Sequence, residues 1–317
     1  MKRSTRFGFL LLFLFLGGML TGCASSSPHQ NQLIRQNTEY RQLIERQKAS
    51  LDEAALNKVP PLNAEGYEKL GDQYFLQGKA DVAFKNYYEA LRLEPGQVRV
   101  RYKMGRLFLE KGLLDEAEKE FRGILEKSPE YALAREGLGR VHFSRNHLNE
   151  AEAEFGKAAQ LDPNLWQAHN FLGILYDRQK QFEKAILHYQ KAIILQPNLG
   201  ILYNNLGMSL FLRGEYQASL EALLEGAKLD SKNKRIQNNL GLLLCKLGRY
   251  EEAFETFKRA GTEASAHYNL GCFYLMEKKY KEAVQSYQKA IDSKPEFYAE
   301  AYEKMNQAKA ALAISNL

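Results

Sequence analysis

The sequence predicts an all-α protein in which seven helix–turn–helix repeats stack into a solenoid closed by a final helix. Two observations predict this fold class. A glycine recurs every 34 residues over most of the chain, and small, aromatic and proline residues keep the same step behind it. A repeat of this length is one helical hairpin, which cannot bury its apolar face alone and therefore stacks on its neighbours.

The first 22 residues have the pattern of a cleaved signal peptide. Lys2, Arg3 and Arg6 precede an apolar run over 7–16, which is too short to span a bilayer as a helix. The sequence Leu-Thr-Gly-Cys that ends at Cys23 resembles the lipobox of bacterial lipoproteins. The resemblance implies cleavage before Cys23 and a lipid thioether on its sulfur. An ordinary secretory signal with a chance cysteine is the alternative.

The residues behind Cys23 bear on the location of the chain. Ala24 follows the cysteine, where an aspartate in Gram-negative lipoproteins tends to retain the protein at the inner membrane. We therefore expect an anchor at the periplasmic face of the outer membrane, with an inner-membrane lipoprotein as the alternative. Residues 23–30 are predicted to form a flexible tether. Residues 31–63 are predicted to form a spacer whose amphipathic helix, 31–57, either has no partner or docks on the repeats or on a partner helix.

Three framework positions keep the repeat step. The glycines are Gly71, Gly105, Gly139, Gly173, Gly207 and Gly241, followed after 30 residues by Gly271. Twelve residues after each glycine the sequence has Ala83, Ala117, Ala151, Ala185, Ser219, Ala253 and Ala283. Sixteen residues after each glycine it has Tyr87, Phe121, Phe155, Tyr189, Leu223, Phe257 and Tyr287. This pattern resembles the tetratricopeptide repeat (TPR), which implies a right-handed superhelix of helical hairpins. Small residues on helix A (the first of each hairpin) and helix B (the second) let the two backbones approach.

The period sets the repeat boundaries. We predict repeats at 64–97, 98–131, 132–165, 166–199, 200–233, 234–263 and 264–297, with a capping helix over 298–317. The fifth repeat has Ser219, Leu223 and Gly226 at framework positions, so we expect it to pack less tightly. The sixth repeat is four residues short, and its deletion at Gly261–Glu263 predicts a clipped helix B or a tightened turn.

Catalytic and metal-binding motifs are missing from the sequence. It has no Gly-x-Ser-x-Gly, His-Glu-x-x-His or phosphate-binding loop, so we predict that the chain is not an enzyme and needs no cofactor, metal or small-molecule substrate. Its small net charge of +6 also argues against a nucleic-acid partner. His142, His169 and His267 are interpreted as packing residues. Cys245 and Cys272 are interpreted as free thiols, with a disulfide as the alternative, because neighbouring helix axes lie farther apart than bridged Cα atoms.

One stripe of helix A is the candidate binding surface. Counted from the first residue of each repeat, positions 2, 5, 9 and 12 share a face opposite helix B. In the N-terminal repeats this stripe is charged, with Glu65, Glu68, Asp72, Arg99, Arg106, Glu136 and Arg140. In the C-terminal repeats it carries Asn170, Asn204, Met208, Phe211, Asn238, Leu242, Tyr268 and Leu275, with Asn205, Asn239 and Asn269 at position 6. Carboxamides can both donate to and accept from an extended peptide backbone, which predicts a peptide groove. The alternative is that the asparagines only cap or solvate the surface.

Signal, lipobox and repeats together resemble lipoproteins that assist pilus secretins, namely type IV pilus pilotins and TPR lipoproteins of tight-adherence (Flp) pilus loci. Residues 202–207, 238–241 and 259–271 carry the resemblance to the tight-adherence group. It implies a protein partner in an envelope complex, a secretin subunit, with the membrane reached through the lipid anchor. An adaptor for peptidoglycan enzymes is the alternative within the same class of binding proteins.

Overall fold

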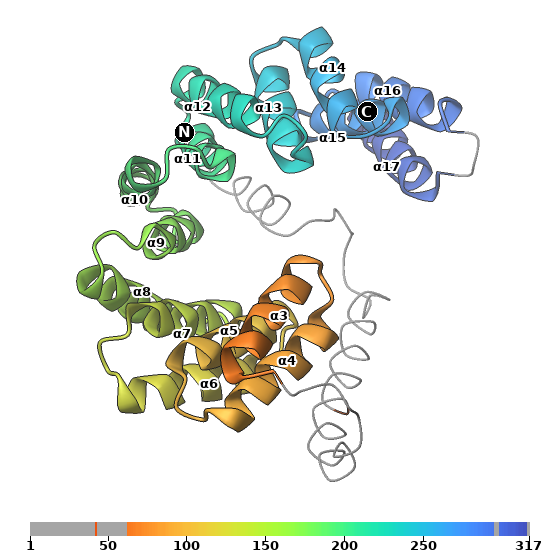
Figure 1. Cartoon of the computed structure of the whole chain (residues 1–317). Helices are drawn as coiled ribbons and strands as arrows, with labels where there is room; N and C mark the ends of the chain where they lie inside the picture. The colour runs from red at the N-terminus through yellow and green to blue at the C-terminus, as the bar shows by residue number, and fades with distance from the viewer. Residues whose placement is uncertain (1–41, 43–61, 295–297, 316–317) are drawn as a thin grey trace. The chain divides into compact units, whose positions relative to one another are not determined.

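A computed structural model describes residue 42, residues 62–294 and residues 298–315. The predicted signal peptide, Cys23, the tether and, apart from Gln42, the helix over 31–57 lie outside the described residues. Within the described residues the chain forms fifteen α-helices and no β-strand, which confirms the predicted all-α repeat fold (Figure 1). None of these helices is long and apolar enough to cross a membrane. The chain divides between Ala168 and His169 into two compact units, which are described separately.

Unit 1 ends at Ala168 and consists of helical hairpins in which odd-numbered helices are A helices and even-numbered ones are B helices. Its helices are α3 (Ala64–Leu76), α4 (Ala80–Leu93), α5 (Val98–Glu110), α6 (Leu114–Lys127), α7 (Ala132–Ser144) and α8 (Leu148–Leu161). Helix α9 (Trp166–Arg178) begins in unit 1 and continues into unit 2. Each A helix packs along the B helix that follows it (Figure 1).

Unit 2 begins at His169 and continues the same arrangement. Its further helices are α10 (Phe182–Leu195), α11 (Gly200–Arg213), α12 (Tyr216–Leu229), α13 (Lys234–Lys246), α14 (Tyr250–Ala260), α15 (Glu263–Met276), α16 (Tyr280–Asp292) and α17 (Ala299–Ser315). Helix α17 packs on α16 and buries Ala301, Met305 and Ala308, so it covers the apolar face that the last repeat would otherwise expose.

The turn from helix A to helix B has a constant backbone shape. Its residue at repeat position 15 has a positive φ in every repeat, namely Gly78, Gly112, Asn146, Lys180, Gly214, Gly248 and Lys278. Glycine adopts this left-handed conformation without steric cost, and asparagine tolerates it better than lysine does. The turn geometry is therefore kept even where the residue type is unfavourable.

The framework glycines are explained by the ring that stands sixteen residues later. A Cβ atom added to Gly71 would lie 2.5 Å from the Tyr87 ring, and one added to Gly173 would lie 2.5 Å from the Tyr189 ring. Phe121 is fully buried and packs against glycines of two repeats, Gly105 and Gly137. The aromatic side chain of helix B thus occupies the space that a larger residue on helix A would need.

The fifth repeat packs closely, so the expectation of looser packing was wrong. The hydroxyl of Ser219 donates to the carbonyl of Gly207 at 2.7 Å, and both Ser219 and Leu223 are fully buried. A Cβ atom added to Gly200 would lie 2.7 Å from the carbonyl oxygen of Gly226. Two glycines on facing helices therefore bring the backbones of α11 and α12 into contact.

The sixth repeat is shorter in helix B and in the turn that follows it. Helix α14 has 11 residues, whereas α12 in the preceding repeat has 14. A capping box then starts α15: the Thr262 backbone amide donates to the Ser265 hydroxyl at 2.7 Å, and the Ser265 amide donates to the Thr262 hydroxyl at 3.2 Å. The clipped helix that the sequence predicts is confirmed, and the capping box explains how the next helix restarts so soon.

Candidate functional site

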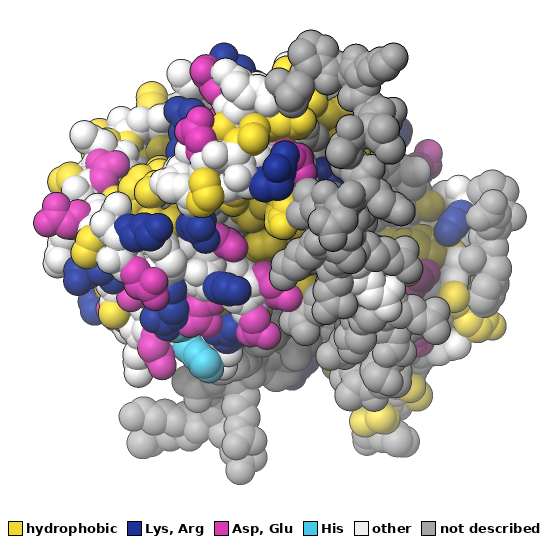
Figure 2. Space-filling view, turned by 60° about the horizontal axis from the view of Figure 1, so that its bottom comes forward, with side chains coloured by type: hydrophobic (Ala, Val, Ile, Leu, Met, Phe, Trp, Pro, Cys, Tyr) yellow, Lys and Arg dark blue, Asp and Glu magenta, His cyan; other side chains and the backbone are white. Residues whose placement is uncertain are grey.

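The A helices carry the candidate site in both units. Successive A helices contact each other, as α5 does with α7 in unit 1 and α13 does with both α11 and α15 in unit 2. Side chains at positions 5, 6 and 9 can therefore reach from one repeat to the next. The face shown in Figure 2 carries basic and acidic side chains interspersed, without a large field of one sign.

Asparagine pairs connect the A helices of unit 2. The Asn205 amide donates to the Asn170 side-chain oxygen at 2.9 Å, and the Asn239 amide donates to Asn204 at 2.8 Å. The Asn269 amide donates to the Asn238 oxygen at 3.2 Å. In each pair the residue at position 6 of one repeat donates to the residue at position 5 of the repeat before it. The asparagines thus form a ladder, whose rungs hold neighbouring helices together.

Five of the predicted groove residues are buried, which corrects their assignment to an open surface. Asn204 and Asn239 are each 1% exposed, so their amides serve contacts between helices α11 and α13. Phe211, Leu242 and Tyr268 are also buried. The half-exposed members are Asn170, Asn205, Met208, Asn238, Asn269 and Leu275, and we call these six residues the amide face.

A buried aspartate in unit 2 escaped the sequence analysis. Asp177 on α9 accepts hydrogen bonds from the Tyr189 hydroxyl at 2.8 Å and the Ser209 hydroxyl at 2.7 Å. Burial raises the pKa of Asp177 to about 6, although both hydrogen bonds act in the opposite direction. The signal in the sequence was a carboxylate at position 12, which is aromatic in the first, third and fifth repeats. Its partners make it a link between helices α9, α10 and α11.

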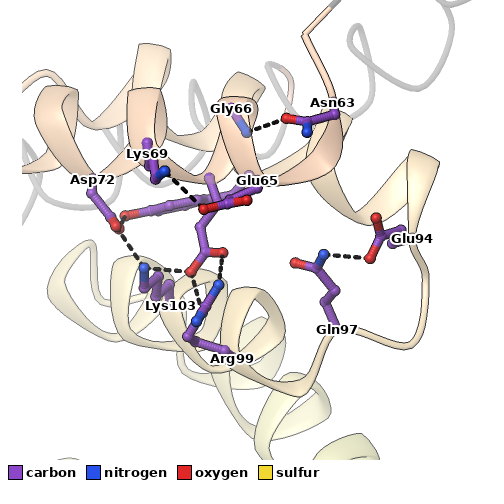
Figure 3. Close-up of polar contacts among 11 residues, drawn as sticks. Asn63, Glu65, Gly66, Lys69, Asp72, Glu94, Gln97, Arg99 and Lys103 are labelled. Atoms are coloured by element: carbon purple, nitrogen blue, oxygen red, sulfur yellow. Dashed lines mark hydrogen bonds and ion pairs between the residues drawn. The ribbon is translucent and has the colours of Figure 1, made fainter.

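An ion network fills the equivalent face of unit 1 (Figure 3). Glu68 on α3 is buried and accepts two hydrogen bonds from Arg99 and one from Lys103, each at 2.6 Å. Lys103 also donates to Asp72 at 2.6 Å, and Asp72 accepts from the Tyr87 hydroxyl at 2.9 Å. Burial raises the pKa of Glu68, but the hydrogen bonds and charges of Arg99 and Lys103 outweigh it and hold the pKa below its ordinary value.

Glu136 on α7 occupies the same repeat position as Glu68 in a different environment. It is 1% exposed, and its Oε1 atom has no hydrogen-bond partner. The cation that faces it on the same helix is Arg140, whose Nη1 atom lies 3.7 Å from Oε1. Burial raises the pKa of Glu136 to about 7, against the opposing charges of Arg140 and Arg106. Unit 1 therefore holds one fully paired carboxylate and one that is poised to take up a proton.

The histidines and cysteines of the described residues make packing contacts, and the rings of His169 and His188 meet with their Nδ1 atoms 3.2 Å apart. Cys245 and Cys272 are free thiols, and the Cys272 sulfur accepts a hydrogen bond from the Tyr287 hydroxyl at 3.4 Å. Burial raises the pKa of Cys245 to about 12, which keeps its thiol protonated. The described residues contain no group of three or more side chains placed to hold a metal ion.

Comparison with known proteins agrees with this architecture. Sequence models of the tetratricopeptide repeat match residues 102–165, 166–199, 204–263 and 264–297, which is more than half of the chain. Residues 64–101 lie outside these matches, although α3 and α4 form the same hairpin. A comparison with curated protein sequences gives no significant match.

Three solved structures illustrate the likeness of fold. A tetratricopeptide repeat protein from Parabacteroides merdae ATCC 43184 is 15% identical with a TM-score of 0.54, and the match covers 78% of this chain and 98% of that one. Pseudomonas aeruginosa pilF is 19% identical with a TM-score of 0.54, covering 67% and 96%. A thermophilic TPR protein of Thermus thermophilus, TTC0263, is 18% identical with a TM-score of 0.52, covering 57% and 99%.

Identities this low establish the fold alone, whereas the repeat models match the sequence itself. The matched stretches coincide with the hairpins from α5 to α16, whose glycines and aromatic rings pack as the repeat requires. The chain therefore belongs to the tetratricopeptide repeat family, whose members are generally non-enzymatic scaffolds that bind protein or peptide partners.

Proposed function

We propose that this chain is a periplasmic scaffold, anchored to the outer membrane by a lipid on Cys23, that binds a segment of a pilus or secretion-system secretin. The observation that carries the binding role is the amide face of unit 2. There, half-exposed carboxamides alternate with the apolar side chains of Met208 and Leu275 on consecutive A helices. Such a surface can hydrogen-bond a backbone and bury side chains at the same time.

The pairing of the amides leaves capacity for a ligand. Each carboxamide has two donor hydrogens and two acceptor lone pairs, and one rung of the ladder uses only one of each. Asn238 and Asn269 share a single hydrogen bond and are both half-exposed. A partner backbone can therefore pair with them without breaking the contact between helices. Met208 adds a flexible side chain that adapts to different apolar partners.

The location and partner rest on the sequence. A positive n-region, a short apolar run and the lipobox at Cys23 support lipidation, and acyl chains contribute about 0.8 kcal/mol per buried CH₂ to membrane binding. The secretin is proposed because residues 202–207, 238–241 and 259–271 resemble tight-adherence lipoproteins. These stretches include Asn204, Asn205, Asn238, Asn239 and Asn269.

Catalysis has no place in the proposed role. The carboxylate of Asp177 in unit 2 is buried and accepts hydrogen bonds from the hydroxyls of Tyr189 and Ser209, so it serves packing between helices. Both thiols have a pKa raised by burial, which disfavours a nucleophilic thiolate. We therefore propose that the chain acts by binding only.

A charge placed on the amide face should abolish partner capture. Met208→Glu and Leu275→Glu should each lower co-purification of the secretin by about tenfold or more, because the bound partner would have to bury an unpaired carboxylate. Leu187→Glu is the matched control, since Leu187 is 51% exposed on the B helix α10. Unchanged capture by both face variants, or equal secretin multimers on gels from cells lacking the gene, would refute the proposal.

Removal of the lipid attachment site should release the protein from the membrane. Cys23→Ser should move the chain from the outer-membrane fraction to the soluble periplasmic fraction, because the thioether forms on a cysteine and the next cysteine in the sequence is Cys245. Fractionation followed by immunoblotting measures this. Membrane retention of the Cys23→Ser protein in secretin-free cells would contradict the anchor, whereas a Cys245→Ser control should remain at the membrane.

A further inference from the structure

Two arginines on the A helices of unit 1 share one face with aromatic side chains. Arg106 on α5 and Arg140 on α7 both occupy position 9 of their repeats, and the two helices contact each other. The Arg106 guanidinium lies 5.4 Å from the centroid of the Phe75 ring, an arrangement that orients its planar group. This set differs from the amide face of unit 2 in position and in charge.

Each arginine has an acidic neighbour one turn away on its own helix. Arg140 lies 3.7 Å from Glu136, and Arg106 lies 3.8 Å from Glu110. Glu68, by contrast, receives three hydrogen bonds at 2.6 Å from the cations of the next repeat (Figure 3). The side chains of Arg106 and Arg140 remain 39% and 26% exposed, so a ligand can reach both.

The carboxylate of Glu136, which is buried beside this pair, lacks a hydrogen-bond partner at one oxygen. Glu136 Oε1 is shielded from solvent and accepts no hydrogen bond, which is costly for an ionised oxygen. The charged and titratable groups that act on it are Arg140 on its own helix and Arg106 and Tyr102 on α5. Tyr102 stays protonated, because burial, and then the nearby Glu136 charge, raises the pKa of its hydroxyl. When Glu136 takes up a proton, the net charge of Arg106, Arg140 and Glu136 rises from +1 to +2.

We propose that Arg106 and Arg140 form a site for the side-chain carboxylates of an acidic protein segment, with Glu136 as a positioning residue beneath them. Guanidinium groups match carboxylates in shape and donate paired hydrogen bonds to them. The Phe75 and Tyr102 rings offer apolar surface to the aliphatic part of a bound glutamate. The site lies in unit 1, so it is independent of the proposed function of the amide face.

Binding at this site should take up a proton. An ionised Glu136 repels an incoming carboxylate, and the pKa of Glu136 is about 7, so the neutral form dominates at pH 6 and the charged form at pH 8. Affinity for an acidic segment should therefore be up to about tenfold tighter at pH 6 than at pH 8. The segment's own carboxylates are ionised at both values.

The test uses the purified full chain and a fluorescent peptide that is acetylated, amidated and contains four consecutive glutamates. Fluorescence anisotropy should show binding of this peptide and little binding of a matched glutamine peptide. Arg106→Gln and Arg140→Gln should each weaken binding about tenfold, as expected for loss of charge-assisted hydrogen bonds. Arg92→Gln is the control, because Arg92 is exposed on α4 and pairs with its neighbour Glu89. Circular dichroism verifies that each variant is folded.

A second variant isolates the role of Glu136. Glu136→Gln should retain binding at pH 6 and lose the difference between pH 6 and pH 8. Met208→Glu should bind the acidic peptide normally, so failure of one proposal can be told from failure of the other. Equal binding of the glutamate and glutamine peptides, undiminished binding by both arginine variants, or a pH dependence that survives in Glu136→Gln would overturn the inference.

Discussion

Replacing Phe121 by alanine should lower the free energy of unfolding of unit 1 by about 3–5 kcal/mol. The ring is fully buried between Gly105 and Gly137, which have no side chains that could move into the vacated space. The cavity would therefore persist, and the lost contacts would affect two repeats at once. Because a repeat stack unfolds through its interfaces, damage at this point should also uncouple the hairpins on either side.

Urea unfolding followed by far-ultraviolet circular dichroism measures this effect on Phe121→Ala. Leu76→Ala is the control, since Leu76 is 86% exposed and its loss should change stability by no more than about 0.5 kcal/mol. Adding Gly105→Ala to Phe121→Ala should recover part of the loss, because the new methyl group enters the cavity. A loss below about 1 kcal/mol for Phe121→Ala would show that the ring is not the wedge between these repeats.

Two glycine-to-alanine substitutions should have opposite signs. Gly200→Ala should destabilise unit 2 by about 2–3 kcal/mol, because its Cβ would lie 2.7 Å from the carbonyl oxygen of Gly226. That oxygen belongs to the backbone of α12, so it cannot rotate away as a side chain could. Gly156→Ala in the interior of α8 should stabilise unit 1 by about 0.5–1 kcal/mol, since nothing lies within 4 Å of its added Cβ and alanine favours the helix.

The two variants, Gly200→Ala and Gly156→Ala, serve as controls for each other. Thermal and urea unfolding give the sign of each change, and amide hydrogen exchange of α11 and α12 locates it for Gly200→Ala. Exchange should accelerate in these two helices, where the backbones are forced apart. If Gly200→Ala is as stable as the wild type, the close approach of α11 and α12 is not a requirement of the fifth repeat.

The fold could be predicted from the sequence because the 34-residue period follows the length of one helical hairpin. Glycine, alanine and ring positions recur with each hairpin, so helix boundaries follow from counting, down to the clipped α14. The prediction of looser packing in the fifth repeat fails because Ser219 and Gly226 do not act singly. Together with Gly200 they form a different but equally close contact, through a hydroxyl-to-carbonyl bond and facing glycines.

The candidate site was less predictable because it depends on side chains from two repeats. Counting placed Asn204 and Asn238 on the same stripe, yet Asn204 is buried and Asn238 is half-exposed. Periodicity identifies the face of a helix, but the exposure of one amide depends on how far the next helix lies and what it carries. The same limit explains why the pKa is lowered for Glu68 and raised for Glu136, although both stand at position 5 of their repeats.

Contacts between position 5 of one repeat and position 6 of the next depend on which repeats are neighbours. Glu68 meets Lys103, and the asparagine pairs obey the same rule in unit 2. The hairpins are therefore not interchangeable modules. A shuffled array that set the first repeat before the sixth would bring Glu68 to Asn239 in place of Lys103, so these pairs distinguish the first repeat from the repeats of unit 2, whose asparagine pairs are alike.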